Sequence, residues 1–144
     1  MQPMFGQARE LYQRGVHPRL LLDQQDLQAL RRLTAKGDGK LILLGLRRLA
    51  KPMFKYLGDG STLDALIAEN LAKPQQCYLY AVLVRFWDLA ALAVLDENPK
   101  QIAILAKLLG KIAALPINAG LTPGWPIHYG LMVGYDLLHP HLDA

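Results

Sequence analysis

The sequence predicts an all-α protein, on three observations. Leu and Ala dominate the composition, and the alternating Val, Thr and Ile runs typical of strands are absent. Hydrophobic residues make up 52% of the 144 positions, which is enough to build a core. A long apolar stretch occupies residues 73–95. We therefore expect residues 1–144 to form a single helical domain.

The apolar stretch is expected to form the central helix, from Pro74 to Leu95. From Cys77 onward it carries only two charges, Arg85 and Asp88, and apolar residues occupy every face. A helix of this kind is either buried on all sides or spans a membrane. Charged residues near the middle of a span cost ~2.5–3.5 kcal/mol each, whereas residues three apart on a buried helix can pair. The pattern therefore favours a buried helix over a membrane span.

The first two predicted helices are joined by an extended segment. The first covers about residues 3–14 and ends at Gly15. Pro18 disfavours a helical conformation at the residue before it, so residues 16–22 are expected to be extended. Asp23 is a good N-cap for a second helix that runs to about residue 35. Three of its leucines are expected to face inward and its arginine doublet outward: Leu27, Leu30, Leu33, Arg31 and Arg32.

A third and a fourth helix are predicted, each after a glycine-containing turn, at residues 37–39 and 58–60 respectively. The third runs from Lys40 to about Leu57, and Pro52 must bend or break it. Its inner side is expected to carry Leu41, Leu44 and Gly45, with Arg47 and Arg48 in solvent. The fourth helix is capped by Ser61 or Thr62 and ends near Ala72.

Two more helices follow the central one. Asn98 is a good cap, and Pro99 suits the first helical position of a helix that runs to about Leu115. Its buried side is expected to contain Ile102, Leu105, Leu109 and Ile112. Residues 116–126 are irregular, and a last helix covers about residues 126–138. Successive helices with short turns predict antiparallel hairpins.

Charge and cysteine content exclude several classes of protein. The net charge is +4, but the basic residues are scattered and no dense basic strip with interleaved aromatics occurs. This pattern disfavours nucleic-acid binding. A single cysteine, Cys77, precludes an intramolecular disulfide, and we expect it to be a small buried residue. No signal peptide is visible at the start, which lacks a basic region followed by an apolar core.

The sequence contains none of the catalytic motifs that are recognised by a fixed spacing of residues. The glycines at residues 37–39 lack the spacing of a phosphate-binding loop, and no His-Glu-x-x-His motif occurs. His139 and His141 provide only two imidazoles, which is a weak metal site. We therefore predict no metal ion and no cofactor.

The last helix carries the most informative polar residues. Trp125, His128, Met132 and Tyr135 follow one another at spacings of three and four, so they share a helix face. Aromatic rings stack on sugars, and imidazole, phenol and amide groups supply hydrogen bonds and proton transfer. The alternative is that this stripe belongs to the core. Tyr129 lies at the edge of this face, and Asn118 belongs to the preceding loop. The candidate substrate-binding residues are Asn118, Trp125, His128, Tyr129 and Tyr135.

Several segments resemble polysaccharide lyases of the heparinase II/III and alginate lyase group. The run from His17 to Leu21 reads His-Pro-Arg-Leu-Leu and is similar to the opening of those proteins. Asp26-Leu27 and Leu30-Arg31 follow in the same order. The later succession also resembles their helical part: an apolar helix, an acidic Asn/Pro turn, an Ala/Leu helix and an aromatic helix that ends in Tyr-Asp-Leu-Leu at residues 135–138.

The resemblance implies an incomplete α/α toroid with an acidic polysaccharide in its cleft. Such enzymes cleave uronic-acid chains by β-elimination: a polar residue neutralises the uronate, Tyr or His removes the adjacent proton, and a tyrosine protonates the leaving oxygen. The family's catalytic residues lie further along a longer chain, so none is assigned here. We accordingly expect residues 1–144 to be the N-terminal part of such a lyase, completed by the remainder of the parent chain and periplasmic or secreted.

Two other functions remain open on the sequence. One is a non-catalytic helical domain whose exposed groove binds a partner helix. The other is a small membrane-associated helical protein, which the apolar central stretch suggests.

Overall fold

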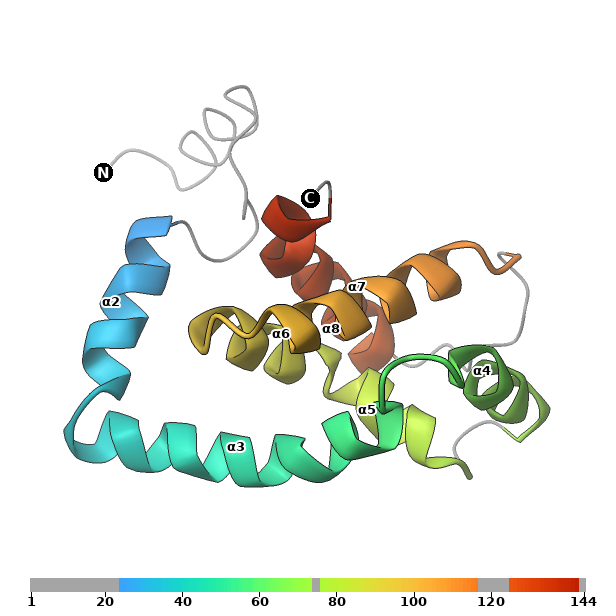
Figure 1. Ribbon diagram of the computed structural model, residues 1–144, viewed down its shortest axis with the longest axis horizontal. Coiled ribbons are helices and arrows are strands. Elements are labelled where there is room, and N and C mark those ends of the chain that lie inside the picture. Colours follow the sequence, from blue (N-terminus) through green and yellow to red (C-terminus); the bar gives the residue numbers. More distant parts are fainter. Residues whose placement is uncertain (1–23, 74–75, 117–124, 143–144) are drawn as a thin grey trace.

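The computed structural model describes residues 24–73, 76–116 and 125–142, and every regular element in these ranges is helical (Figure 1). The predicted all-α class is confirmed. The predicted first helix and the extended segment at residues 16–22 lie outside the described residues. The helices are α2 (Gln24–Thr34), α3 (Gly37–Leu57), α4 (Leu63–Ala72), α5 (Tyr78–Val84), α6 (Phe86–Leu95), α7 (Pro99–Ala113), α8 (Trp125–Leu138) and the short 3₁₀-helix η1 (His139–His141).

Helix α6 is the central element of the fold. It packs most extensively against α8 and also contacts α2, α3, α5 and α7. Phe86, Leu89 and Ala90 are at most 1% exposed, and complete burial of a side chain such as Phe86 contributes about 1.5–3 kcal/mol. The predicted burial of the apolar stretch is therefore confirmed for this half.

The prediction of one continuous helix from Pro74 to Leu95 is wrong. The chain bends by 64° between α5 and α6 at Arg85, although neither Pro nor Gly occurs there. The Arg85 backbone N–H still donates to the carbonyls of Ala81 and Val82, both at 3.2 Å. The predicted pair of Arg85 with Asp88 is present at 3.1 Å. No single described helix is long and apolar enough to cross a membrane, whereas α5 and α6 together, as a bent pair, meet the length and composition for a span.

Two glycines on α8 explain how closely it approaches both halves of the bent pair. A Cβ atom at Gly134 would collide with the Phe86 ring of α6. A Cβ atom at Gly130 would lie 3.2 Å from the carbonyl oxygen of Leu83 in α5. The bend at Arg85 therefore brings both α5 and α6 onto a strip of α8 that has no side chains.

Helix α3 differs from the prediction at its start and at Pro52. Residues 37–39, predicted as a turn, form its first turn, and the helix continues through Pro52 without a break. Pro52 and Arg48 are both exposed. The Arg48 carbonyl, which loses its partner at Pro52, therefore lies on the side open to water, so the helix tolerates the proline.

The inward faces of α2 and α3 also differ from the prediction. Leu33 and Leu41 are each 66% exposed and Leu44 is 39% exposed. The buried residues of α3 are instead Leu43, Ala50 and Leu57, which recur every seven positions. Apolar residues occupy more than one side of α3, so periodicity alone does not reveal which side faces the core.

The start of α7 matches the prediction. The Asn98 side-chain oxygen accepts a hydrogen bond from the Gln101 backbone N–H at 3.2 Å, and Pro99 occupies the first turn. The buried residues of α7 are Ile102, Leu105, Leu108 and Ile112, while the predicted Leu109 is half-buried. Lys111 binds Asp64 at 2.6 Å and so ties α7 to α4.

Cys77 is not inside a helix. It occupies the N-cap position of α5, is half-buried, and accepts a hydrogen bond from the Asn70 amide nitrogen at 2.9 Å. Asn70 is 2% exposed. The thiol therefore gives a buried amide of α4 its partner.

Candidate functional site

The aromatic face of α8 points outward. Tyr129, Met132 and Tyr135 are 39%, 57% and 43% exposed, and His128 is exposed beside them. His128, Met132 and Tyr135 share one face of α8 as predicted, with Tyr129 at its edge, and none of the four belongs to the core. We call His128, Tyr129, Met132 and Tyr135 the α8 aromatic face.

The opposite side of α8 determines the direction of this face. Ile127, Val133 and Leu137 are each at most 5% exposed, and Gly130 and Gly134 close against α5 and α6. Because residues three and four apart lie on the same side of a helix, burying these positions leaves the aromatic positions in solvent. Asp136 also lies on the buried side and is 4% exposed.

The rings continue past the end of α8. Those of Tyr135 and His139 meet edge to face, with centroids 5.4 Å apart and planes at 82°. Imidazole and phenol groups both donate and accept hydrogen bonds. The exposed rings add apolar faces suited to the C–H surfaces of a sugar. The arrangement thus combines stacking surfaces with polar atoms able to bind hydroxyl or carboxylate groups.

Three of the five predicted binding residues, His128, Tyr129 and Tyr135, are exposed on α8. Trp125 is the first residue of α8, but its side chain is outside the described part of the chain. Asn118 also lies outside the described residues. The roles of these two residues remain predictions.

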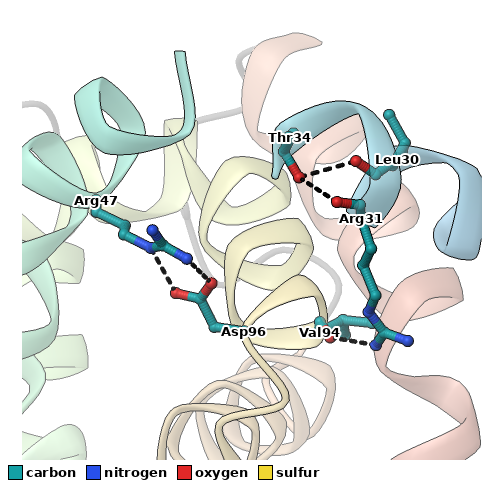
Figure 2. A network of polar contacts seen from close by, with 6 residues as sticks. All are labelled: Leu30, Arg31, Thr34, Arg47, Val94 and Asp96. Carbon is teal, nitrogen blue, oxygen red and sulfur yellow. Dashed lines mark hydrogen bonds and ion pairs between the residues drawn. The ribbon is translucent and has the colours of Figure 1, made fainter. Parts of the chain in front are cut away.

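A pair of arginines, both predicted to face solvent, forms a second polar centre. Arg31 donates from Nη2 to the Val94 carbonyl at 2.9 Å and pairs with Glu97 at 3.0 Å. Arg47 binds Asp96 through two hydrogen bonds, of 2.6 and 3.1 Å. Figure 2 shows both arginines reaching the C-terminal end of α6 from different helices. The hydrogen bond with Asp96 raises the pKa of the Arg47 guanidinium above its ordinary value.

In the described part of the chain, the first arginine of each doublet contacts the end of α6, although Arg47, like Arg48, is an exposed residue. Arg32 and Arg48 are exposed, while Arg31 is half-buried and Arg47 reaches the Asp96 carboxylate. The available sequence signal was the acidic pair Asp96-Glu97 at a helix end, where cations also complement the helix dipole. That signal does not indicate which arginine of a doublet makes the contact.

A hollow of about 400 Å³ lies beside Arg31, between α2, the junction of α6 and α7, and η1. Its walls are largely apolar, with Arg31, Glu97 and His141 as polar members. The Arg31 Nε atom is buried and has no hydrogen-bond partner among the described residues. The α8 aromatic face does not line this hollow. The aromatic face and the arginine centre are therefore separate places on the molecule.

Metal-ligating residues do not gather anywhere in the described ranges: no group of three or more His, Cys, Asp or Glu side chains is positioned to hold an ion. His139, one of the two histidines noted in the sequence, instead contacts Tyr135. The chemistry available on the aromatic face is accordingly that of rings, phenols and imidazoles.

Comparison with models of protein families, with characterised proteins and with solved structures finds no match for this chain.

Proposed function

We propose that this chain is the N-terminal helical segment of a polysaccharide lyase that cleaves uronic-acid-containing polysaccharide, such as alginate or a glycosaminoglycan, by β-elimination. The observation that carries the proposal is the exposure of His128, Tyr129 and Tyr135 on a helix whose opposite side is buried. These side chains offer the stacking and hydrogen-bonding groups that sugar binding requires.

Two further features support an acidic polysaccharide as the ligand. The net charge of +4 favours an anionic partner. The all-helical arrangement, with α6 covered by its neighbours, is compatible with paired helices that belong to an incomplete α/α toroid. In this proposal the α8 aromatic face contributes cleft contacts, and the groups that remove and donate protons belong to the remainder of the parent chain.

The first test measures the reaction itself. The natural full-length protein is incubated with alginate, heparan sulfate and chondroitin sulfate, and the absorbance of the unsaturated uronate product is followed. We expect the absorbance to rise on one class of acidic polysaccharide. No increase on any of the three would count against lyase activity.

The second test measures binding by the α8 aromatic face. Tyr135→Ala and His128→Ala are each expected to weaken binding of a uronate oligosaccharide by about tenfold, because each removes a contact worth about 1–1.5 kcal/mol. Tyr78→Ala is the control, since Tyr78 is a similarly exposed tyrosine, at 42%, that lies against Tyr56 instead. Isothermal titration calorimetry at low ionic strength measures the affinities.

The control defines the outcome that contradicts the proposal. If Tyr135→Ala and Tyr78→Ala reduce binding equally, the α8 aromatic face has no special role. Circular dichroism melting of each variant checks that the fold is retained, which is expected because all three side chains are exposed.

A further inference from the structure

The outer side of α3 carries a second exposed apolar surface. Leu41, Ile42 and Leu49 are 66%, 64% and 61% exposed, and Gly45 lies exposed among them. These positions are on the side of α3 away from its buried residues Leu43, Ala50 and Leu57. In Figure 1, α3 runs along one long edge of the molecule. We call Leu41, Ile42, Gly45 and Leu49 the α3 outer face.

Nothing in the described part of the chain explains why position 45 is occupied by glycine. A glycine inside a helix costs about 1 kcal/mol relative to alanine. On α8, close neighbours explain Gly130 and Gly134. A Cβ atom at Gly45 would meet no described atom within 4 Å. A small residue in an exposed apolar face is what close approach of another helix requires.

The positions around Gly45 have the geometry of a helix-packing hole. Ile42, Gly45, Leu46 and Leu49 follow the spacing i, i+3, i+4, i+7, which on a helix surface surrounds one inserted side chain. Beside them, a recess of about 50 Å³ between α3 and α6 is lined by Leu46, Leu49, Ala50 and Leu89 together with Arg85 and Asp88. The recess has room for the tip of an apolar side chain.

Positive charge borders the α3 outer face along one flank. Arg48, Lys51 and Lys55 are exposed next to it, and α3 carries only one acidic residue, Asp38. At the helical spacing of about 100° per residue, these three cations fall on the same side of the apolar stripe. A ligand that is complementary to this surface therefore has a stripe of apolar side chains with acidic side chains along one edge of that stripe.

We propose that the α3 outer face binds an acidic amphipathic helix of a partner protein. The partner's apolar side chains pack over Gly45 and into the recess, and its carboxylates lie against Arg48, Lys51 and Lys55. A second copy of α3 does not supply this acidic flank, because Asp38 is the only acidic residue of the helix. Binding to a lipid surface does not require a glycine in the contact. The cations lie on only one side of the apolar stripe, which matches a partner helix that lies alongside α3.

The test uses two synthetic amphipathic helical peptides that differ only in charge. Both carry leucines at positions i, i+3, i+4 and i+7; one has glutamates along one flank, and the other has lysines there. By fluorescence anisotropy, we expect the glutamate peptide to bind the protein at least about tenfold more tightly, and 0.5 M salt to reduce this difference because screening weakens exposed charge pairs.

A matched pair of glycine variants tests the docking geometry. Gly45→Leu fills the hole and is expected to weaken binding of the glutamate peptide by about tenfold or more. Gly110→Leu, in the interior of α7, is the control, because a Cβ atom there also meets no described atom within 4 Å. It is expected to leave the affinity unchanged. Neither variant touches the α8 aromatic face, so uronate binding should be retained.

The competing outcomes are distinguishable. Equal affinity for both peptides, or no loss with Gly45→Leu, would overturn the proposal. Vesicles of phosphatidylglycerol and phosphatidylcholine provide the other arm, because Gly45→Leu adds apolar surface and should strengthen binding to a membrane. Increased vesicle binding by Gly45→Leu, without peptide binding, would assign the α3 outer face to a lipid surface.

Discussion

At Gly134, the absence of a side chain allows the Phe86 ring to lie directly against the α8 backbone. At Gly110, the space beyond the helix is open in the described structure. Glycine therefore has opposite effects on stability at these two helix-interior positions. Close packing requires the first glycine, whereas the second only lowers the helix propensity of α7.

Alanine at these two positions is predicted to have opposite effects. Gly134→Ala should lower the free energy of unfolding by about 1–3 kcal/mol, because the added methyl group must displace Phe86. Gly110→Ala should raise it by about 0.5–1 kcal/mol through helix propensity. Urea denaturation followed by circular dichroism measures both changes. A stabilising effect of Gly134→Ala would show that α8 is not seated on Phe86 in this way.

Tyr56 provides a residue-scale prediction about pH. Burial, with smaller contributions from nearby Cys77 and Glu69, raises the pKa of its phenol above the ordinary value of 10.0. The folded state therefore retains the proton more tightly than the unfolded state. The resulting stability is fully present below pH 10 and is lost as the pH rises through the folded pKa.

Comparison with Tyr56→Phe isolates this effect. The difference in unfolding free energy between the parent protein and Tyr56→Phe should be constant from pH 7 to about 9 and should shift against the parent above about pH 10. Urea denaturation at a series of pH values gives the difference. A difference that stays constant up to pH 11 would contradict the direction of the pKa shift.

At the scale of elements, the C-terminal end of α6 holds the α2–α3 hairpin in place. Arg31 from α2 and Arg47 from α3 bind three residues there: Val94, Asp96 and Glu97. Thr34 closes the last turn of α2 by donating to the Leu30 carbonyl at 2.8 Å (Figure 2). Two positive groups also complement the negative end of the α6 dipole.

The arginine doublet in α3 supplies its own control for this tether. Arg47→Gln should lower the free energy of unfolding by about 0.5–1 kcal/mol, because it breaks a two-bond contact that is partly exposed. Arg48→Gln should change it by less than about 0.5 kcal/mol, since Arg48 is exposed. Thermal melts at low and high salt measure both variants. Equal effects would mean that the Arg47–Asp96 pair does not hold α3.

Sequence patterns predicted some elements well and others poorly, for physical reasons. Asn98 and Pro99 act locally, so the start of α7 was predictable from the chain itself. The bend at Arg85 depends on how α5 and α6 meet α8, and no residue at the bend signals it. The inner side of α3 was misassigned because leucines occupy both its buried and its open sides. The exposure of the α8 aromatic face likewise depended on tertiary packing, because the same stripe was compatible with a core position.

For the molecule as a whole, the packing predicts an uneven distribution of stability. Helix α6 contacts five other helices, and its side chains are the most buried in the described chain. Helices α2 and α3 expose large apolar side chains such as Leu33 and Leu41. Local opening should therefore require less free energy in the hairpin than in the centre.

Hydrogen–deuterium exchange measures this distribution directly. Amides of α6 and of the buried side of α8 should exchange slowest, by global unfolding, whereas amides of α2 and the first half of α3 should exchange faster by local opening. Addition of the glutamate peptide should slow exchange in α3 and leave α8 unchanged. Uniform exchange across all helices would show that the hairpin and the centre unfold as one unit.

The seating of α8 on Phe86 has a consequence for how this surface can diversify. Because the glycine strip locks the helix from behind, its rotation about its own axis does not depend on which residues face the solvent. We therefore expect that His128, Tyr129 and Tyr135 can be replaced without changing the orientation of α8. Under the proposed sugar binding, exchange of these three exposed side chains should change which sugar is preferred without altering the buried side of α8.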